Sequence, residues 1–301
     1  MNPEGPEPCG ILLLDKPLHL SSNAALQRVR RLLGRPKAGH TGSLDPLATG
    51  MLPICIGEAT KLAGALLEGA KGYTFEMRLG ERTDTGDAEG AIVERAAVPR
   101  LDAARIEAAL AAQRGQQAQV PPMYSALKRQ GQPLYRLARA GLEVERAPRQ
   151  IEIHELVLLE CGADSLRLRL RCSKGTYVRV LAEQLGASLG TCAHLTALRR
   201  DFVEPFREAP MHTLEQLEAL AGAPPLLPAD VAVAHLPALG LSAAQARAIG
   251  HGQPISAPGA PLGGLRLYDA SGRFLGLGNG LDGGIVRPSR LFAAAIAQTR
   301  N

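Results

Sequence analysis

The chain of 301 residues contains no tryptophan and only five tyrosines and five phenylalanines. It also has no apolar run long enough to span a membrane. A hydrophobic content of 46% still allows a sizeable core, so the length fits one large domain or two smaller ones. Because aromatic residues are scarce, each tyrosine in a polar segment is a candidate for a functional role.

The five cysteines are odd in number and include no CxxC pair, so neither a zinc site nor a disulfide framework is expected. Cys55 and Cys172 lie in apolar or strand-like runs, which predicts buried thiols in a reducing compartment. The opening MNPEGPEPCG lacks the basic segment and apolar core of a signal peptide. We therefore expect a cytoplasmic protein without membrane association.

A net charge of +5 and a pI of about 9.1 fit an anionic partner. Two basic clusters fall in residues 28–37 and 128–149. Either one alone predicts a solvated face, but two clusters beside unusual loops favour contact with a phosphate backbone. The clusters are Arg28, Arg30, Arg31, Arg35 and Lys37, and Lys128, Arg129, Arg136, Arg139, Arg146 and Arg149.

Hydrophobic patterning predicts both strands and helices. Strands are expected at 10–15, 52–57, 73–80, 91–98, 151–160 and 166–173, and helices at 23–34, 58–69, 103–115 and 176–186. We expect 73–80 to pair with 91–98 across the turn-rich ERTDTGDAEG. Residues 116–150 are basic and poorly patterned, which is typical of a functional loop or a mobile flap.

The C-terminal part has a different character. Residues 221–237 are rich in alanine and proline, which predicts a domain boundary. A helix at 243–252, capped by Ser242, precedes three or four short strands with glycine-rich turns. This pattern predicts a small β-barrel of roughly 60 residues, a size that is only marginally stable alone.

The loop GHTGSLDPLATG at 39–50 holds one carboxylate, Asp45. Pro46 disfavours helical backbone angles at Asp45, and the glycines allow a backbone or a ligand to come close. An Asx-turn is the commonest role of a loop aspartate, but a plain turn needs none of His40, Thr41 and Ser43. A lone carboxylate favours attack or proton abstraction, since a glycosidase needs two acids and a metal site needs more ligands.

The stretch GHTGSLDPLATGMLPICIGEATK resembles the signature of the bacterial tRNA pseudouridine synthase B family, which isomerises uridine 55 in the T-loop of tRNA. The resemblance continues, in family order, through DKPLHLSS, KGYTFEMRLGERTDTGDAEG, VPPMYSALKRQGQPLYRLARAG, SKGTYVRVLAEQLG and AHLTALRR. Together these motifs span most of the first 200 residues. One departure is His19, which stands where the family commonly has a glycine in DKPxGxSS.

The resemblance implies an α+β fold in two domains. A catalytic domain at 1–237 is expected to form a mixed, mainly antiparallel sheet with flanking helices. An RNA-binding flap is expected at about 120–150, and a PUA-like β-barrel at 238–301. The barrel is supported mostly by its position and its strand-rich pattern.

The family reaction breaks the N1–C1′ bond, rotates the base and rejoins it through C5, without cofactor or metal. By resemblance Asp45 is the catalytic carboxylate and Arg179 is its ion-pair partner. Tyr73 is implied to stack on the target base, and its hydroxyl to help remove the C5 proton. Whether the acid adds to the sugar or takes its 2′ proton stays open at this stage.

The resemblance also implies a set of RNA contacts. His40 would take the place that the everted uridine leaves in the RNA. Tyr177 and Leu198 would line the base pocket. Lys16, Lys61 and Lys174 are candidate phosphate contacts. The implied partner is the T-arm of tRNA, bound by a monomer with no obligate protein partner.

Two alternatives remain open from the sequence. The first is an RNA-binding folding helper with incidental or lost isomerase activity. The second is a related synthase that acts on ribosomal RNA within a guide ribonucleoprotein. The trio of Asp45, Tyr73 and Arg179 favours an enzyme, because a pure binder has no use for it. The continuous flap and short tail favour the stand-alone type.

Overall fold

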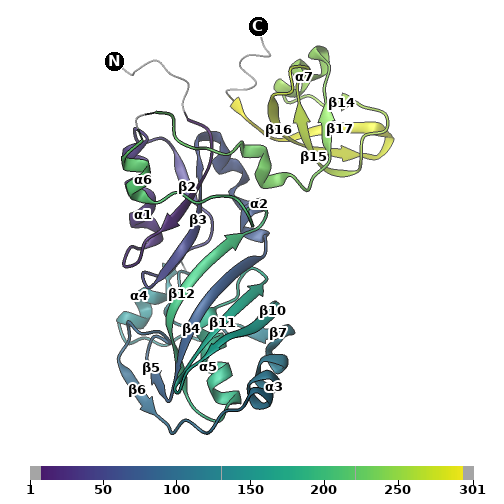
Figure 1. The fold of residues 1–301 in the computed structure, drawn as a ribbon. Helices are drawn as coiled ribbons and strands as arrows, with labels where there is room; N and C mark the ends of the chain where they lie inside the picture. Colours follow the sequence, from purple (N-terminus) through teal and green to yellow (C-terminus); the bar gives the residue numbers. More distant parts are fainter. Residues whose placement is uncertain (1–7, 130, 221, 294–301) are drawn as a thin grey trace.

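The structure is a computed structural model that describes residues 8–129, 131–220 and 222–293. Its centre is an eight-stranded sheet in the order β1-β3-β12-β4-β11-β10-β7, with β2 paired to β3 (Figure 1). The β3–β12 pair is parallel and the other pairs of this sheet are antiparallel. The expected α+β class with a mixed, mainly antiparallel sheet is therefore confirmed.

The strands of this sheet are β1 (Gly10–Lys16), β2 (Ala38–His40), β3 (Ala48–Ile56), β4 (Lys71–Leu79), β7 (Gly115–Gln119), β10 (Arg149–Cys161), β11 (Ser165–Cys172) and β12 (Ala193–Val203). Its helices are α1 (Ser22–Leu32), η1 (Gly57–Leu62), α2 (Ala63–Glu68), α3 (Ala103–Gln113), α5 (Val178–Ser188), α6 (Leu214–Glu218) and η2 (Ala229–Val233).

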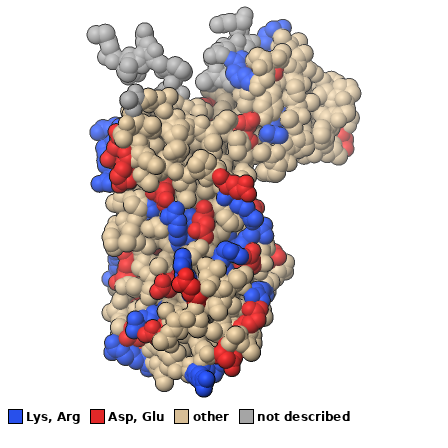
Figure 2. Space-filling model, viewed as in Figure 1, with Lys and Arg blue, Asp and Glu red and all other residues tan. Residues whose placement is uncertain are grey.

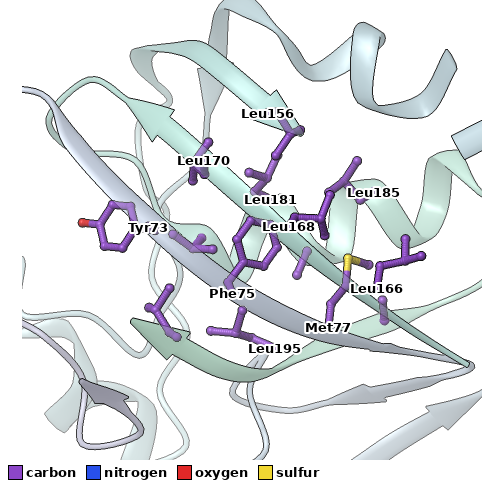
Figure 3. Packing of buried hydrophobic residues seen from close by; sticks show 14 of the residues in the cluster. Tyr73, Phe75, Met77, Leu156, Leu166, Leu168, Leu170, Leu181, Leu185 and Leu195 are labelled. Atoms are coloured by element: carbon purple, nitrogen blue, oxygen red, sulfur yellow. The ribbon is translucent and has the colours of Figure 1, made fainter. Parts of the chain in front are cut away.

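Strict alternation along β4 and β11 gives the sheet one apolar face. Tyr73, Phe75 and Met77 lie opposite Leu170, Leu168 and Leu166 in register, and this face packs with residues of α3 and α5 in one buried cluster. Each buried leucine or phenylalanine contributes about 1.5–3 kcal/mol. Figure 3 shows Tyr73 at the edge of this cluster, with its hydroxyl directed away from the leucines.

The opposite face of the same strands is charged. The three arginines of β11 pair with glutamates: Arg167 with Glu160, Arg169 with Glu155 and Arg171 with Glu204. Figure 2 shows acidic and basic side chains intermixed over the middle of the molecule. The leucine and arginine alternation in LRLRLRC thus marks a sheet with one buried face and one solvated face.

The helix starts follow the expected capping chemistry. Ser21 Oγ accepts from the amide of Ala24 (3.1 Å) at the start of α1, and Asp102 Oδ1 accepts from the amide of Arg105 (2.8 Å) at the start of α3. The next residue, Ser22, is already helical, and its hydroxyl contacts the backbone of Leu44 instead.

Two sequence predictions are wrong. Residues 73–80 do not pair with 91–98, because β4 lies between β11 and β12 and a short β5 (Glu81–Thr83) pairs with β6 (Ile92–Arg95). Residues 58–69 are not one helix but a 3₁₀ turn, η1, followed by α2.

Strand β12 was not predicted at all. Its sequence, AHLTALRRDFV, contains two β-bulges, between Leu195 and Ala197 and between Arg200 and Phe202. Each bulge shifts the side-chain phase by one residue, so the strand shows no clean period of two.

The segment that joins β7 to β10 contains β8 (Lys128–Arg129), β9 (Gln132–Pro133) and α4 (Leu134–Arg139). Backbone hydrogen bonds from Leu134 to Leu127 (2.7 Å) and from Tyr135 to Ser125 (3.0 Å) close it on itself. It is therefore a short ordered substructure, although its sequence lacks periodicity.

The C-terminal part is a five-stranded sheet in the order β13-β15-β16-β17-β14. Its elements are β13 (Ala238–Gly240), α7 (Ala243–Gly250), β14 (Ile255–Ser256), β15 (Gly263–Tyr268), β16 (Phe274–Leu281), η3 (Asp282–Gly284) and β17 (Ile285–Leu291). Ser242 caps α7 in a reciprocal capping box with Gln245, as the sequence indicates.

The structure bears on two further predictions, the burial of the cysteine thiols and the lack of a membrane-spanning segment. Cys55, Cys172 and Cys192 are buried, whereas Cys9 and Cys161 are exposed, and all five thiols are free. Within the described ranges, none of the helices has the length and apolar character needed to cross a membrane. The cytoplasmic location stays a prediction.

One glycine carries a strong steric constraint. Gly50 has φ +95°, and a Cβ atom there would lie 2.2 Å from the carbonyl oxygen of Arg200 on the parallel neighbour β12. We expect Gly50→Ala to lower the free energy of unfolding by about 3 kcal/mol, from left-handed strain plus overpacking. Urea unfolding measures this change.

Gly39→Ala is the matched control, because nothing lies within 4 Å of a Cβ built at Gly39 and its φ is not left-handed. It should change stability by less than about 1 kcal/mol. Equal stabilities of the two variants would contradict the close packing of β3 against β12.

Candidate active site

A cavity of about 600 Å³ opens beside the ends of β4, β11 and β12. Seven of the nine predicted site residues line it: His40, Asp45, Tyr73, Lys174, Tyr177, Arg179 and Leu198. They come from segments far apart in sequence, which the strand order brings together.

The loop that carries Asp45 is fixed by the DKPLHLSS segment. Ser22 Oγ accepts from the amide of Leu44 (2.7 Å) and donates to the carbonyl of Leu44 (2.9 Å). The amide of His19 donates to the carbonyl of Pro46 (2.8 Å). These contacts hold the backbone on both sides of Asp45.

His19 has a backbone conformation that glycine adopts easily. Its φ is +64°, in the left-handed region, which costs a non-glycine residue about 1–2 kcal/mol. The turn at His19 is therefore formed at an energetic cost that a glycine would avoid.

Asp45 forms an ion pair with Arg179, in which Nη2 lies 2.9 Å from Oδ2. The arginine is buried, with 5% of its surface exposed, while the Asp45 side chain keeps 41% of its surface accessible. The pair is thus anchored in the protein and has one open side, which faces the cavity.

Arg179 has further acceptors besides Asp45. Nη2 also donates to the carbonyl of Tyr124 (2.7 Å), and Nη1 donates to the carbonyl of Thr85 (3.1 Å) and lies 3.5 Å from Oδ2 of Asp87. Asp45 is therefore not the lone acid that the sequence indicates. The turn ERTDTGDAEG delivers a second, buried carboxylate to the same guanidinium.

Burial raises the pKa of Asp45 above its usual range, and the negative charge of Asp87 adds to this. The charges of Arg179 and Lys16 offset part of the rise. The carboxylate is therefore a stronger base than an aspartate in water, which suits both attack and proton abstraction.

Tyr73 stands opposite Arg200 in the β4–β12 register. Burial raises the pKa of Tyr73, and the Arg200 guanidinium partly offsets this by its charge and by a side-chain hydrogen bond. The preceding Gly72 is required because a Cβ there would lie 2.0 Å from the ring of Phe202. The KGY motif is thus explained by close packing as well as by the tyrosine.

Tyr177 is positioned through its backbone. Its amide donates to Oε1 of the buried Gln119 (2.7 Å), and its carbonyl accepts from Nε2 of the same side chain (3.2 Å). This bidentate contact fixes the start of α5, two residues before Arg179.

His40 lies in the wall of the cavity, half-buried. Burial and the charge of Arg200 lower its pKa, so its ring is neutral at physiological pH. Its Nδ1 is buried and has no hydrogen-bond partner among the described residues.

Two of the three candidate lysines do not line the cavity. Lys16 is fully buried and donates to the carbonyls of Pro17 (2.9 Å) and Leu20 (2.6 Å), so it cannot reach a phosphate in this structure. Lys61 lies at the junction with the C-terminal sheet, where it pairs with Glu58 and donates to the carbonyl of Leu291 (2.7 Å). Lys174 lies at the cavity and pairs with Glu68.

Residues 30–178 match the TruB family pseudouridylate synthase N-terminal domain. The chain belongs to this family. Residues 179–233 match the tRNA pseudouridylate synthase B C-terminal domain, and residues 237–292 match the C-terminal domain of pseudouridine synthase II TruB.

Full-length relatives agree with this membership. The tRNA pseudouridine synthase B of Chromohalobacter salexigens is 52% identical over 293 residues, which cover 95% of each chain. The tRNA pseudouridine synthase B of Aromatoleum aromaticum is 53% identical, and the match covers 96% of this chain and 94% of the relative.

Solved structures show the same fold. A Cbf5-Nop10-Gar1 complex matches with a TM-score of 0.69 and 25% identity, and the match covers 90% of this chain and 78% of that chain. An H/ACA RNP bound to a substrate RNA containing 2′-deoxyuridine matches with a TM-score of 0.71, and the match covers 94% of this chain and 84% of that chain. At 23% identity, the second match concerns the fold alone.

The ion pair predicts opposite stability effects for its two partners. Because the pKa of Asp45 is raised on folding, its ionised form destabilises the protein above the usual aspartate pKa of about 3.8. Asp45→Asn should therefore keep or slightly raise the unfolding free energy at pH 7. That difference should vanish as the pH falls below the usual aspartate range.

Arg179→Met should lower the unfolding free energy by about 3–5 kcal/mol, because it leaves the carboxylate of Asp87, with 4% of its side chain exposed, without its cation. Urea unfolding of both variants across pH measures these effects. Equal destabilisation by both would contradict the shared role of Arg179.

Proposed function

We propose that this protein isomerises uridine to pseudouridine at position 55 in the T-loop of tRNA. The observation that carries the proposal is the Asp45–Arg179 ion pair, open to a cavity that Tyr73 and Tyr177 also line. Relatives at 52% and 53% identity named tRNA pseudouridine synthase B support tRNA as the substrate. Membership of an isomerase family makes a pure RNA-folding helper the weaker alternative.

Asp45 is the proposed catalytic residue for cleavage of the N1–C1′ bond. A carboxylate in a site with little water interacts more strongly with developing positive charge on the ribose than one in bulk solvent. Its base strength serves either route, attack on C1′ or removal of the 2′ proton. In both routes Arg179 holds the carboxylate in place through an anchored guanidinium.

Tyr73 is proposed to stack on the detached base and to assist loss of the C5 proton. Because burial raises the pKa of its phenol, the hydroxyl is protonated when the base arrives. It can therefore accept the C5 proton only while it passes its own O–H proton to a solvent water at the open cavity, which carries the proton away. Tyr177 and Leu198 would enclose the base from the other sides of the cavity.

His40 is proposed to fill the gap in the RNA that the everted uridine leaves. Its neutral ring suits stacking between bases, since no charge needs to be desolvated. Lys174 and the two basic clusters would contact phosphates.

The domain plan is also proposed. Residues 1–237 would form the catalytic domain, and residues 238–301 a PUA-like RNA-binding domain. The segment of about 120–150 would act as a flap over the T-arm. The hydrogen bond from Arg179 to the carbonyl of Tyr124 supports this, because it joins the flap directly to the cation that holds Asp45. We expect a cytoplasmic monomer that needs no cofactor, metal or obligate protein partner.

The decisive experiment follows tritium release from a tRNA transcript labelled at C5 of uridine. Release from free tRNA, lost when position 55 is changed to cytidine, is expected for the wild type. Asp45→Asn should abolish it. Asp164→Asn is the matched control, because Asp164 pairs with Arg78 (2.9 Å) on the surface away from the cavity, and it should keep full activity.

Other outcomes would select the alternatives. Release only when a guide RNA and ribosomal RNA are supplied would indicate the guide ribonucleoprotein type. Faster tRNA folding without any release would indicate the folding helper.

The rate should depend on pH in a defined direction. Because burial raises the pKa of Asp45, turnover should rise with pH through an inflection above the usual aspartate value of about 3.8. Single-turnover rates between pH 4 and pH 8 locate this inflection. A rate already at its plateau at pH 4 would contradict a raised pKa at the catalytic acid.

Tyr73→Phe separates the ring from the hydroxyl. Release of the C5 proton should slow by about 10²-fold or more, the range for general acid–base groups. The affinity for RNA should stay nearly constant, because the ring still stacks. Tyr73→Ala, which also removes the stack, should weaken binding by about 1–3 kcal/mol. Normal proton release in the phenylalanine variant would exclude the hydroxyl role.

A further inference from the structure

Arg200 is, with Lys16, among the largest fully buried side chains of the protein, and 2% of its surface is exposed. It lines the cavity, yet the proposed reaction assigns no role to its guanidinium. Its adjacent neighbour Arg199 points to the opposite face of β12 and pairs with Asp15 through two hydrogen bonds (3.0 and 2.8 Å). The two arginines of one motif thus have different environments.

The contacts of Arg200 in the described part of the chain are all with uncharged groups. Nε donates to the carbonyl of Met51 (2.7 Å), and Nη2 donates to the carbonyl of Gly42 (3.1 Å). The third neighbour is Tyr73, which stands directly opposite Arg200 in the β4–β12 register and lines the same cavity; the charge and side-chain hydrogen bonding of the guanidinium lower the pKa of its phenol. A buried cation without a carboxylate is costly, so a purely structural role would be better filled by a neutral side chain.

The three contacts join the pieces of the site. Gly42 lies three residues before Asp45 in the catalytic loop, and Tyr73 lies on β4 directly across from Arg200. Met51 lies on β3, the strand that follows the loop. Gly50 leaves room for the strands to approach, and Gly42 has φ +79°, with a Cβ there only 3.4 Å from Nη1 of Arg200.

We propose that Arg200 is a positioning residue, which fixes the Tyr73 hydroxyl at a set place relative to the Asp45 loop. Its planar guanidinium offers donors in several fixed directions, so one side chain can hold the loop and the phenol together. Both groups must act on the same nucleotide, the acid at the sugar and the hydroxyl at C5. This inference rests on the proposed function.

The test compares Arg200→Lys with the wild type in turnover of the tritiated tRNA, counted per RNA-binding site by stoichiometric titration. Lysine keeps the charge but cannot span the three partners. We expect kcat per site to fall about 10²-fold, as for a reacting group displaced by about 1 Å. The KM for RNA should change less than about threefold, because phosphate contacts lie elsewhere.

Arg199→Lys is the matched control, with the same chemical change one residue away on the exposed face. Its kcat should equal that of the wild type. The proposal is overturned if Arg200→Lys keeps kcat within about threefold of the wild type. It is also overturned if activity falls only in proportion to the loss of RNA-binding sites, since the arginine then supports the fold alone.

A second measurement decides the case if Arg200→Lys does not fold. In protein labelled with ¹⁵N-arginine, Tyr73→Phe should shift the side-chain resonances of Arg200 and leave those of Arg199 in place. Unchanged Arg200 resonances overturn the proposal. A wild-type protein inactive on tRNA would refute the proposed function, whereas an active wild type with an equally active Arg200→Lys variant would refute only this inference.

Discussion

The site depends on one buried guanidinium. Arg179 is held by two backbone carbonyls and two carboxylates, which come from three separate segments: the loop of Asp45, the turn that contains Thr85 and Asp87, and the β7–β10 segment that contains Tyr124. A buried cation is tolerated only when its hydrogen-bonding capacity is filled, so these segments must converge for the protein to fold. The same requirement places the carboxylate of Asp45 at the cavity.

Glycines and hydroxyls complete this arrangement around the loop of Asp45. Ser22 contacts both backbone groups of Leu44, and Gly50 allows β3 to pack against β12 without a side chain between them. His19 accepts left-handed strain to keep the turn that supports Pro46. Such local costs are typical of functional sites, where geometry is retained at the expense of stability.

Many helix starts, strand faces and site residues could be predicted from the sequence. Capping residues such as Asp102 and Ser242, and the strict alternation in β11, mark helix starts and strand faces through local chemistry. The resemblance to a known family identified seven residues that the structure places around one cavity. Their individual roles stay predictions, because no ligand contact tests them.

The strand order and the surroundings of several residues could not be predicted, because they depend on pairing between segments far apart in the sequence. The sequence cannot show which strands meet β4, nor the phase of β12 once its bulges have shifted the alternation. For that reason Arg200 could not be distinguished from Arg199. Lys16 and Lys61 have ordinary lysine surroundings in sequence, and only the tertiary fold shows that one is buried and the other faces the C-terminal sheet. Asp87 likewise became part of the site only through the position of α5.

The strand order has a consequence for how the chain is made. Strand β12, residues 193–203, lies between β3 and β4, which end at residues 56 and 79. On the ribosome, β3 and β4 are therefore synthesised long before the strand that joins them. Their unpaired edges stay exposed in the nascent chain, and catalysis has to wait until β12, about two thirds of the way along the chain, has emerged.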